Sequence, residues 1–114
     1  MSAQPQLAEH VIDQLADWGE VRARRMFGGV GLFHEARMFG LIFSGQLYFR
    51  VDRAAAEADS ERAFGYQRGQ RWVRLPYLRI DAEALEHPEA LARLADAAWL
   101  AAGTKQRTRK GVSA

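Results

Sequence analysis

Cysteine is absent from the chain, which removes disulfides, thiolate metal sites and cysteine nucleophiles together and fits a reducing compartment. The apolar stretches break after a few residues, so none is long enough to span a bilayer. The N-terminal residues MSAQPQLAEH lack the basic and then apolar segments of a secretory signal. We therefore expect a cytoplasmic protein with no membrane partner.

Acidic residues are scarce or absent in two stretches. Residues 21–51 hold five arginines against Glu35, and residues 64–80 hold four arginines and no acid. Four further basic residues lie at 105–110, so residues 1–103 hold twelve basic and fourteen acidic residues, a net charge of −2. Because most acids fall in expected helices, we expect a basic sheet surface and acidic helices, a field that orients an anionic partner.

Hydrophobic periodicity divides the 114 residues, 48% of which are hydrophobic, into the helices and strands of one compact domain. Helical spacing predicts a first helix over residues 7–18. Alternation predicts three strands between residues 26 and 51. In the second of these strands it places Phe39, Leu41 and Phe43 on one face.

A short helix through residue 62, two strands around a turn at Gly69-Gln70 and a last helix ending at Gly103 complete the order. This order predicts an α+β fold of two layers, an antiparallel sheet of about five strands with helices on one face. We expect the other face to be exposed, wholly or in part, or buried in a dimer. Residues 1–103 form the predicted domain, and residues 104–114 form a predicted disordered basic tail.

Four segments of the chain, MFGGVGLF, RMFGLI, LYFRVD and PYLRI, resemble the N-terminal domain of the TfoX/Sxy competence regulators. The resemblance covers residues 10–101. It implies a small domain similar to the secretion-chaperone-like α/β folds, with which the predicted order α-β3-α-β2-α agrees. It also implies a regulatory, non-enzymatic role beside a transcription factor. Full-length members of the family carry a second domain after this one. Because the chain stops at Ala114, we expect that domain to be missing.

The glycines Gly28, Gly29 and Gly31 invite comparison with a phosphate-binding loop. Such a loop needs a nearby lysine and a helix that follows it, whereas here a strand follows and no lysine is near. We therefore expect these glycines to permit a bulge or a close backbone approach within the sheet.

Catalytic and metal-binding constellations are not visible in the sequence. The histidines His10, His34 and His87 are far apart and share no metal-ligand spacing. Ser44 and Ser60 lack the context of a nucleophile elbow. We therefore expect no enzyme activity, no cofactor and no metal.

Aromatic residues alternate with arginines on two predicted strands. Alternation puts Tyr48 with Arg50, and Trp72 with Arg74, on the face opposite the core. Several modules bind single-stranded nucleic acid on such a sheet, because bases stack on the rings while arginines follow the phosphates. Exposed aromatics and arginines are also enriched at protein contacts, so a dimer interface and plain core packing stay open.

The basic cluster at the C-terminal end has two interpretations. Short basic tails usually add solubility or weak electrostatic attraction, and this one could also add to the predicted nucleic-acid surface. If all four of its charges met phosphates on duplex DNA, log affinity would fall with log salt at a slope of about −3.6. Such binding would be weak and blind to sequence. The predicted partner surface consists of Tyr48, Arg50, Trp72, Arg74, Lys105, Arg107, Arg109 and Lys110.

The sequence therefore predicts a regulatory protein that acts through protein or nucleic-acid contacts, with a transcription factor or DNA as partner. Two alternatives remain, both unrelated to competence. The first is a homodimeric protein-interaction module with Trp72 and Tyr48 as buried anchors. The second is a small-ligand-binding domain with polar groups converging near the glycine turn.

Overall fold

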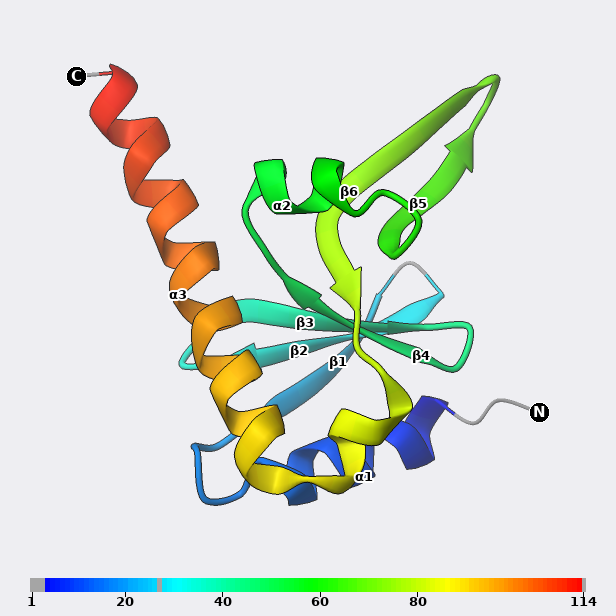
Figure 1. The fold of residues 1–114 in the computed structure, drawn as a ribbon, viewed down its shortest axis with the longest axis vertical. Coiled ribbons are helices and arrows are strands. Elements are labelled where there is room, and N and C mark those ends of the chain that lie inside the picture. The colour runs from blue at the N-terminus through cyan, green and yellow to red at the C-terminus, as the bar shows by residue number, and fades with distance from the viewer. Residues whose placement is uncertain (1–3, 27, 114) are drawn as a thin grey trace.

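A six-stranded antiparallel sheet with helices packed on one face forms the described part of the computed structural model, residues 4–26 and 28–113 (Figure 1). The sheet order is β1-β2-β3-β4-β6-β5. The elements are α1 (Gln4–Gln14), β1 (Arg22–Met26), β2 (Gly29–His34), β3 (Arg37–Phe43), β4 (Gln46–Arg50), α2 (Arg53–Ala58), β5 (Ala63–Arg68), β6 (Arg71–Arg79), the 3-10 helix η1 (Ala82–Glu86) and α3 (Pro88–Ser113). The predicted α+β class is confirmed.

The main core lies between the sheet and two helices, α1 and α3. From the sheet, Phe39 and Leu47 are buried in it, and Val11 of α1 and Leu91 of α3 are fully buried against them. Each fully buried side chain of this size contributes about 1.5–3 kcal/mol to the free energy of unfolding. Within the described residues, no helix is both long and apolar enough to cross a membrane.

A bulge in β3 changes which side chains enter this core. Strand β2 pairs Leu32 with Gly40 and Phe33 with Met38, which leaves Phe39 as an extra residue in β3. Phe39 lies in the main core, whereas Leu41 lies in a second cluster on the other face. The expectation that Phe39 shares a face with Leu41 and Phe43 is wrong, because the bulge shifts the alternation by one residue.

The second cluster covers part of the sheet face that carries no helix. Leu41, Phe64 and Tyr77 are buried in it, and half-buried apolar side chains pack around them. The Phe64 ring stands edge-on to Phe43 at 5.3 Å and to Tyr48 at 5.2 Å between ring centroids. Phe64 of strand β5 therefore covers part of the face that we expected to be exposed in whole or in part.

Two element boundaries differ from the sequence-based expectation. Strand β1 was not predicted, because four of its five residues are exposed and show no apolar alternation. The last helix does not end at Gly103 but continues to Ser113, so residues 104–113 are helical rather than disordered. Ala114 lies outside the described residues. The domain boundary after residue 103 stays a prediction.

Gly103 has a packing role inside α3. An ideal Cβ at this position would lie 2.5 Å from Nη1 and 2.7 Å from Cζ of Arg37. A side chain at this position would require the Arg37 guanidinium to shift from its place against the helix. Gly103 thus reflects close packing and not the end of a helix.

Candidate interaction surfaces

The hairpin of β5 and β6 projects from the rest of the sheet (Figure 1). We call residues 65–74 of this hairpin the arm. Trp72 of the arm is 59% exposed. No acidic residue occurs in β5, β6 or the turn between them. The exposed arginines of the arm are Arg68, Arg71 and Arg74. The arm therefore presents an indole ring among unopposed positive charges.

The indole of Trp72 lies against Gly65 on the neighbouring strand. An ideal Cβ at Gly65 would approach three ring atoms of Trp72 to 2.6 Å. The register pairs Gly65 with Arg74 and Gln67 with Trp72, so Trp72 and Arg74 share one face of the arm. The glycine therefore leaves room for the Trp72 ring on the face of the hairpin that also carries Arg74.

The two predicted aromatic–arginine pairs lie on opposite faces of the sheet. Phe64 and Leu75 belong to the second cluster, and each directly neighbours in sequence a residue of the face that carries Trp72. Tyr48 belongs to the second cluster as well. The prediction that the two pairs share one face of the sheet is therefore wrong. Because Phe64 and Leu75 point to the face of the second cluster, alternation places Trp72 and Arg74 on the other face.

Tyr48 and Arg50 are half-buried parts of the second cluster. The Tyr48 ring packs edge-on against Phe64, and the Arg50 guanidinium lies 5.8 Å from the centroid of the Tyr77 ring. Burial raises the pKa of the Tyr77 phenol above its usual value, and the positive charge of Arg50 opposes that rise. The Tyr48 ring is therefore occupied in packing within the second cluster and offers little surface to a partner.

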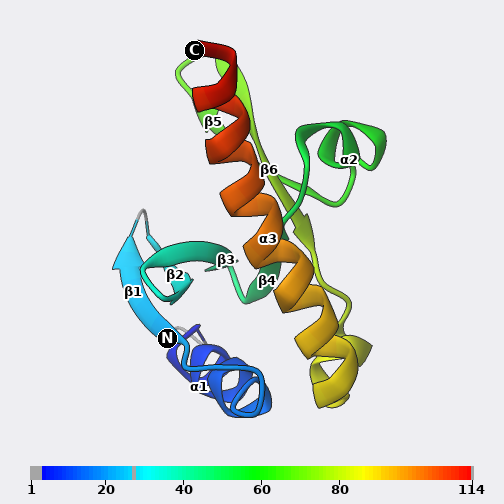
Figure 2. The same cartoon turned by 90° about the vertical axis from the view of Figure 1, so that its left-hand side faces the viewer.

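The predicted basic cluster lies on the last turns of α3. Lys105, Arg107, Arg109 and Lys110 fall within this helix, and their side chains lie outside the description. Figures 1 and 2 show the end of α3 and the tip of the arm projecting toward the same end of the molecule. The backbone thus places two basic segments of the sequence at one end.

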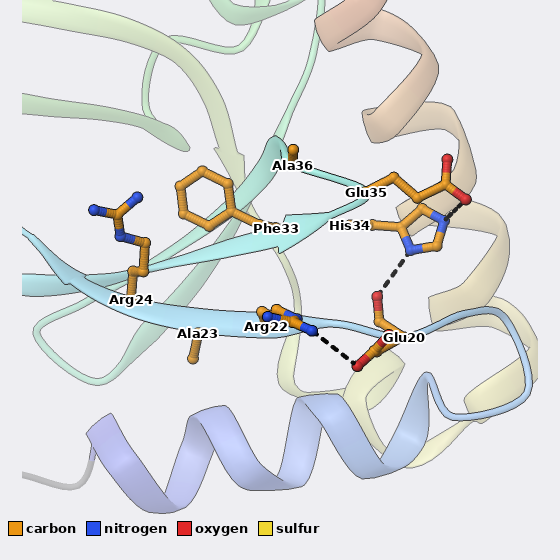
Figure 3. A pocket seen from close by; sticks show the side chains of 8 residues that line it. All are labelled: Glu20, Arg22, Ala23, Arg24, Phe33, His34, Glu35 and Ala36. Atoms are coloured by element: carbon orange, nitrogen blue, oxygen red, sulfur yellow. Dashed lines mark hydrogen bonds and ion pairs between the residues drawn. The ribbon is translucent and has the colours of Figure 1, made fainter.

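A hollow of about 890 Å³ beside β1 and β2 was not foreseen from the sequence. Figure 3 shows Arg24 and Phe33 on the side of these strands away from α1, with the Arg24 guanidinium 5.9 Å from the ring centroid. Arg22 forms an ion pair of 3.7 Å with Glu20, and His34 Nδ1–H donates to the Glu20 carbonyl at 2.8 Å. Alternation of Arg22 and Arg24 was the signal that could have found it. Its lining mixes both charges and includes no residue of the predicted surface.

The glycines at the start of β2 act within the sheet. Gly28 adopts φ +76° in the turn before the strand, and an ideal Cβ at Gly29 would collide with the backbone carbonyl of Ile42. The expected close backbone approach is confirmed. The part of the chain that the structure describes holds no group of three residues able to bind a metal.

Comparison with known proteins agrees with the resemblance seen in the sequence. Residues 13–102 match the family model of the TfoX N-terminal domain. Over 60 residues the chain is 42% identical to DNA transformation protein TfoX1 of Aliivibrio fischeri, a match that takes in 49% of this chain and 29% of that protein. The match therefore spans less than a third of the length of that relative. On the match over residues 13–102, the chain belongs to the TfoX N-terminal domain family.

Proposed function

We propose that this protein is a cytoplasmic, non-enzymatic regulator of competence-related gene expression that contacts nucleic acid through the arm. Its family and its resemblance to a DNA transformation protein support the competence role. The observation that carries the nucleic-acid contact is the arm itself, where an indole that is 59% exposed projects among three exposed arginines with no acid on either strand.

The chemistry of the arm suits single-stranded nucleic acid. An exposed indole gives a face on which any base can stack, and alanine substitution of such rings costs about 1–3 kcal/mol per base. Guanidinium groups bind phosphate oxygens through parallel N–H donors. Sequence specificity would come from a transcription factor that binds together with this protein, because neither stacking nor phosphate contact reads the bases.

The test is fluorescence anisotropy of a labelled single-stranded 12-mer, titrated with protein at several salt concentrations. We expect the Arg68→Gln/Arg71→Gln/Arg74→Gln variant to lose most affinity and to flatten the plot of log affinity against log salt by about 2. The matched control removes the same charge from β1, where Arg22, Arg24 and Arg25 are also exposed. Equal losses in the two triple variants, or no binding by the native protein, would overturn the proposal.

One observation favours a protein partner in place of nucleic acid. Trp72 and Tyr66 are both exposed large hydrophobic residues on the same hairpin, and exposed aromatics often anchor protein interfaces. In that case light scattering would show a homodimer whose mass is unchanged by salt and which Trp72→Ala dissociates. Tyr48 would contribute little to such a dimer, because Phe64 already packs against it.

A further inference from the structure

The sheet has two edges, and the edge formed by β1 is the regular one. Strand β1 pairs with β2 over all five of its residues without a register shift, whereas the pairing of β5 with β6 shifts between Ala63 and Gly65. Bulges and irregular pairing protect the edge of a sheet from the addition of a further strand, and so does proline. The β1 edge has neither protection, since its sequence RARRM contains no proline.

The outer edge of β1 has backbone hydrogen-bonding groups to offer. Among the described residues, no backbone hydrogen bond joins β1 to an element other than β2. Helix α1 packs against β2 and β3, and residues 22–25 are exposed at the margin of the sheet (Figure 2). Alternate N–H and C=O groups of an edge strand point away from the sheet. An extended peptide can therefore pair with β1 as a further strand.

The arginines of β1 determine which peptide fits. Arg24 and Arg25 have no carboxylate within ion-pair distance among the described residues. Arg22 pairs with Glu20 at 3.7 Å, and both side chains are exposed. Opposite charges on neighbouring strands attract and like charges repel. The edge therefore suits an acidic peptide, and it disfavours a second copy of β1, which would bring arginine against arginine.

The hollow beside β1 and β2 favours a peptide over a nucleic acid. Figure 3 shows Arg24 and Phe33 at one end of it, on the sheet face away from α1, and Glu20 and Glu35 at the other end. A nucleic acid carries a negative charge at every phosphate, so a strand laid along β1 would meet both carboxylates. A peptide can place a glutamate opposite Arg24 and an uncharged residue beside Glu20 and Glu35.

We propose that β1 binds an acidic, extended segment of a partner protein, which adds to the sheet as a further strand. The backbone of the segment forms hydrogen bonds with the outer edge of β1. Its carboxylates pair with Arg24 and Arg25, which lie on opposite faces of the strand because side chains alternate. The site shares no residue with the arm, so it does not depend on the proposed nucleic-acid contact.

The probe is a fluorescein-labelled octapeptide, blocked at both ends, with two central glutamates flanked by threonine and valine. Fluorescence anisotropy with the full chain should show saturable binding, and amide chemical shifts in two-dimensional NMR should change at residues 22–26. Affinity should fall about tenfold when both glutamates are replaced by glutamine, and by the same factor in Arg24→Gln/Arg25→Gln. The matched control, Arg71→Gln/Arg74→Gln, removes two exposed arginines from the arm and should leave the affinity unchanged.

Two methylated peptides separate strand addition from attraction between charges alone. In an added strand, alternate backbone N–H groups face β1 and the others face solvent. Methylation of one alternate set of peptide nitrogens should therefore abolish binding, and methylation of the other set should preserve it. This comparison leaves the protein unaltered, so it holds even if Arg24→Gln/Arg25→Gln does not fold.

Other outcomes would overturn the proposal. Equal affinities of the two methylated peptides, unchanged affinity in Arg24→Gln/Arg25→Gln, or shifts that map to residues 65–74 would each reject strand addition at β1. Displacement of the peptide by the single-stranded 12-mer would assign β1 to nucleic acid instead. We expect the 12-mer and the peptide to bind together, with the 12-mer sensitive to changes in the arm and the peptide to changes in β1. Failure of one site is then visible independently of the other.

Discussion

An arginine and a tryptophan lie on the same side of the structure in two regions of the molecule, Arg37 with Trp99 and Arg74 with Trp72. The contacts of the two tryptophans differ. Between β3 and α3, the Arg37 guanidinium lies 3.7 Å from the centroid of the Trp99 ring and donates to the Trp99 carbonyl at 3.1 Å. The Trp99 indole N–H donates to the His34 carbonyl at 2.8 Å. On the arm, the Trp72 indole has no hydrogen-bond partner among the described residues. The first pair holds the fold together, and the second is free to meet a partner.

A glycine makes room for the arginine or the ring in both regions. At Gly103 an added Cβ would meet the Arg37 guanidinium, and at Gly65 it would meet the Trp72 ring. Gly103 is buried inside a long helix, whereas Gly65 lies on a projecting hairpin. The burial of the glycine, and not the presence of an arginine and a tryptophan, therefore distinguishes the pair that stabilises the fold from the pair that is exposed to a partner.

Truncation of the two tryptophans should separate the regions most strongly. We expect Trp99→Ala to lower the free energy of unfolding by about 3 kcal/mol, because the ring packs against the core and its N–H is hydrogen-bonded. Trp72→Ala should change it by less than about 0.5 kcal/mol, since the side chain is exposed. Urea denaturation measures both. Similar losses in the two variants would mean that the arm is part of the folded core.

Substitution of Gly103 tests the tight contact of the structural region. Helix propensity alone predicts that Gly103→Ala stabilises the protein by about 1 kcal/mol. We expect a net loss of about 1 kcal/mol instead, because the new methyl group displaces the Arg37 guanidinium from Trp99. The control is the same substitution in an Arg37→Ala background, where Gly103→Ala should become stabilising. A stabilising effect in both backgrounds would show that Arg37 moves away without cost.

The equivalent change on the arm should affect binding more than folding. Gly65→Ala should displace the Trp72 ring and weaken binding of the single-stranded 12-mer several-fold, while the free energy of unfolding changes by less than about 0.5 kcal/mol. Fluorescence anisotropy and urea denaturation give the two values. In a Trp72→Ala background, Gly65→Ala should have no further effect on affinity. An equal loss in that background would place the effect elsewhere on the hairpin.

Much of the fold could be predicted because its apolar residues follow simple periods. Leu47 and Phe49 enter the main core as alternation predicts, and the last helix begins at Pro88, a residue type that is favoured in the first helical turn. Strand β1 could not be found in this way, since Arg22–Met26 is an edge strand with almost no buried side chain. Gly103 was misread because helix-ending glycines and packing glycines are identical in sequence. The bulge at Phe39 depends on pairing with β2, which a single strand does not encode.

The candidate site could be predicted only where exposure depends on local structure. Trp72 and Arg74 lie on a projecting hairpin, so their exposure follows from the hairpin alone. Tyr48 loses its exposure because Phe64, sixteen residues along the chain, closes over it. A groove of about 410 Å³, lined by Ala55 of α2, Leu78 of β6 and Leu94 of α3, combines segments that no sequence pattern connects.

The smallest expected effect is on the pH dependence of stability, and it compares Arg37, which contacts Trp99, with Arg50, which lies near Tyr77. Burial raises the pKa of the Tyr77 phenol above 10.0, and Arg50 opposes the rise. The stability that depends on protonated Tyr77 is therefore fully present below pH 10, the value for the unfolded chain, and is lost as the pH rises through the raised pKa.

Urea denaturation between pH 8 and 11 should show this loss of stability, and Tyr77→Phe should reduce it. Arg50→Gln should enlarge it, because removal of the positive charge raises the Tyr77 pKa further, whereas Arg37→Gln should leave the slope with pH unchanged. A slope that is the same in the Tyr77→Phe and native proteins would assign the alkaline loss to other groups and leave Arg50 with no electrostatic effect on the second cluster.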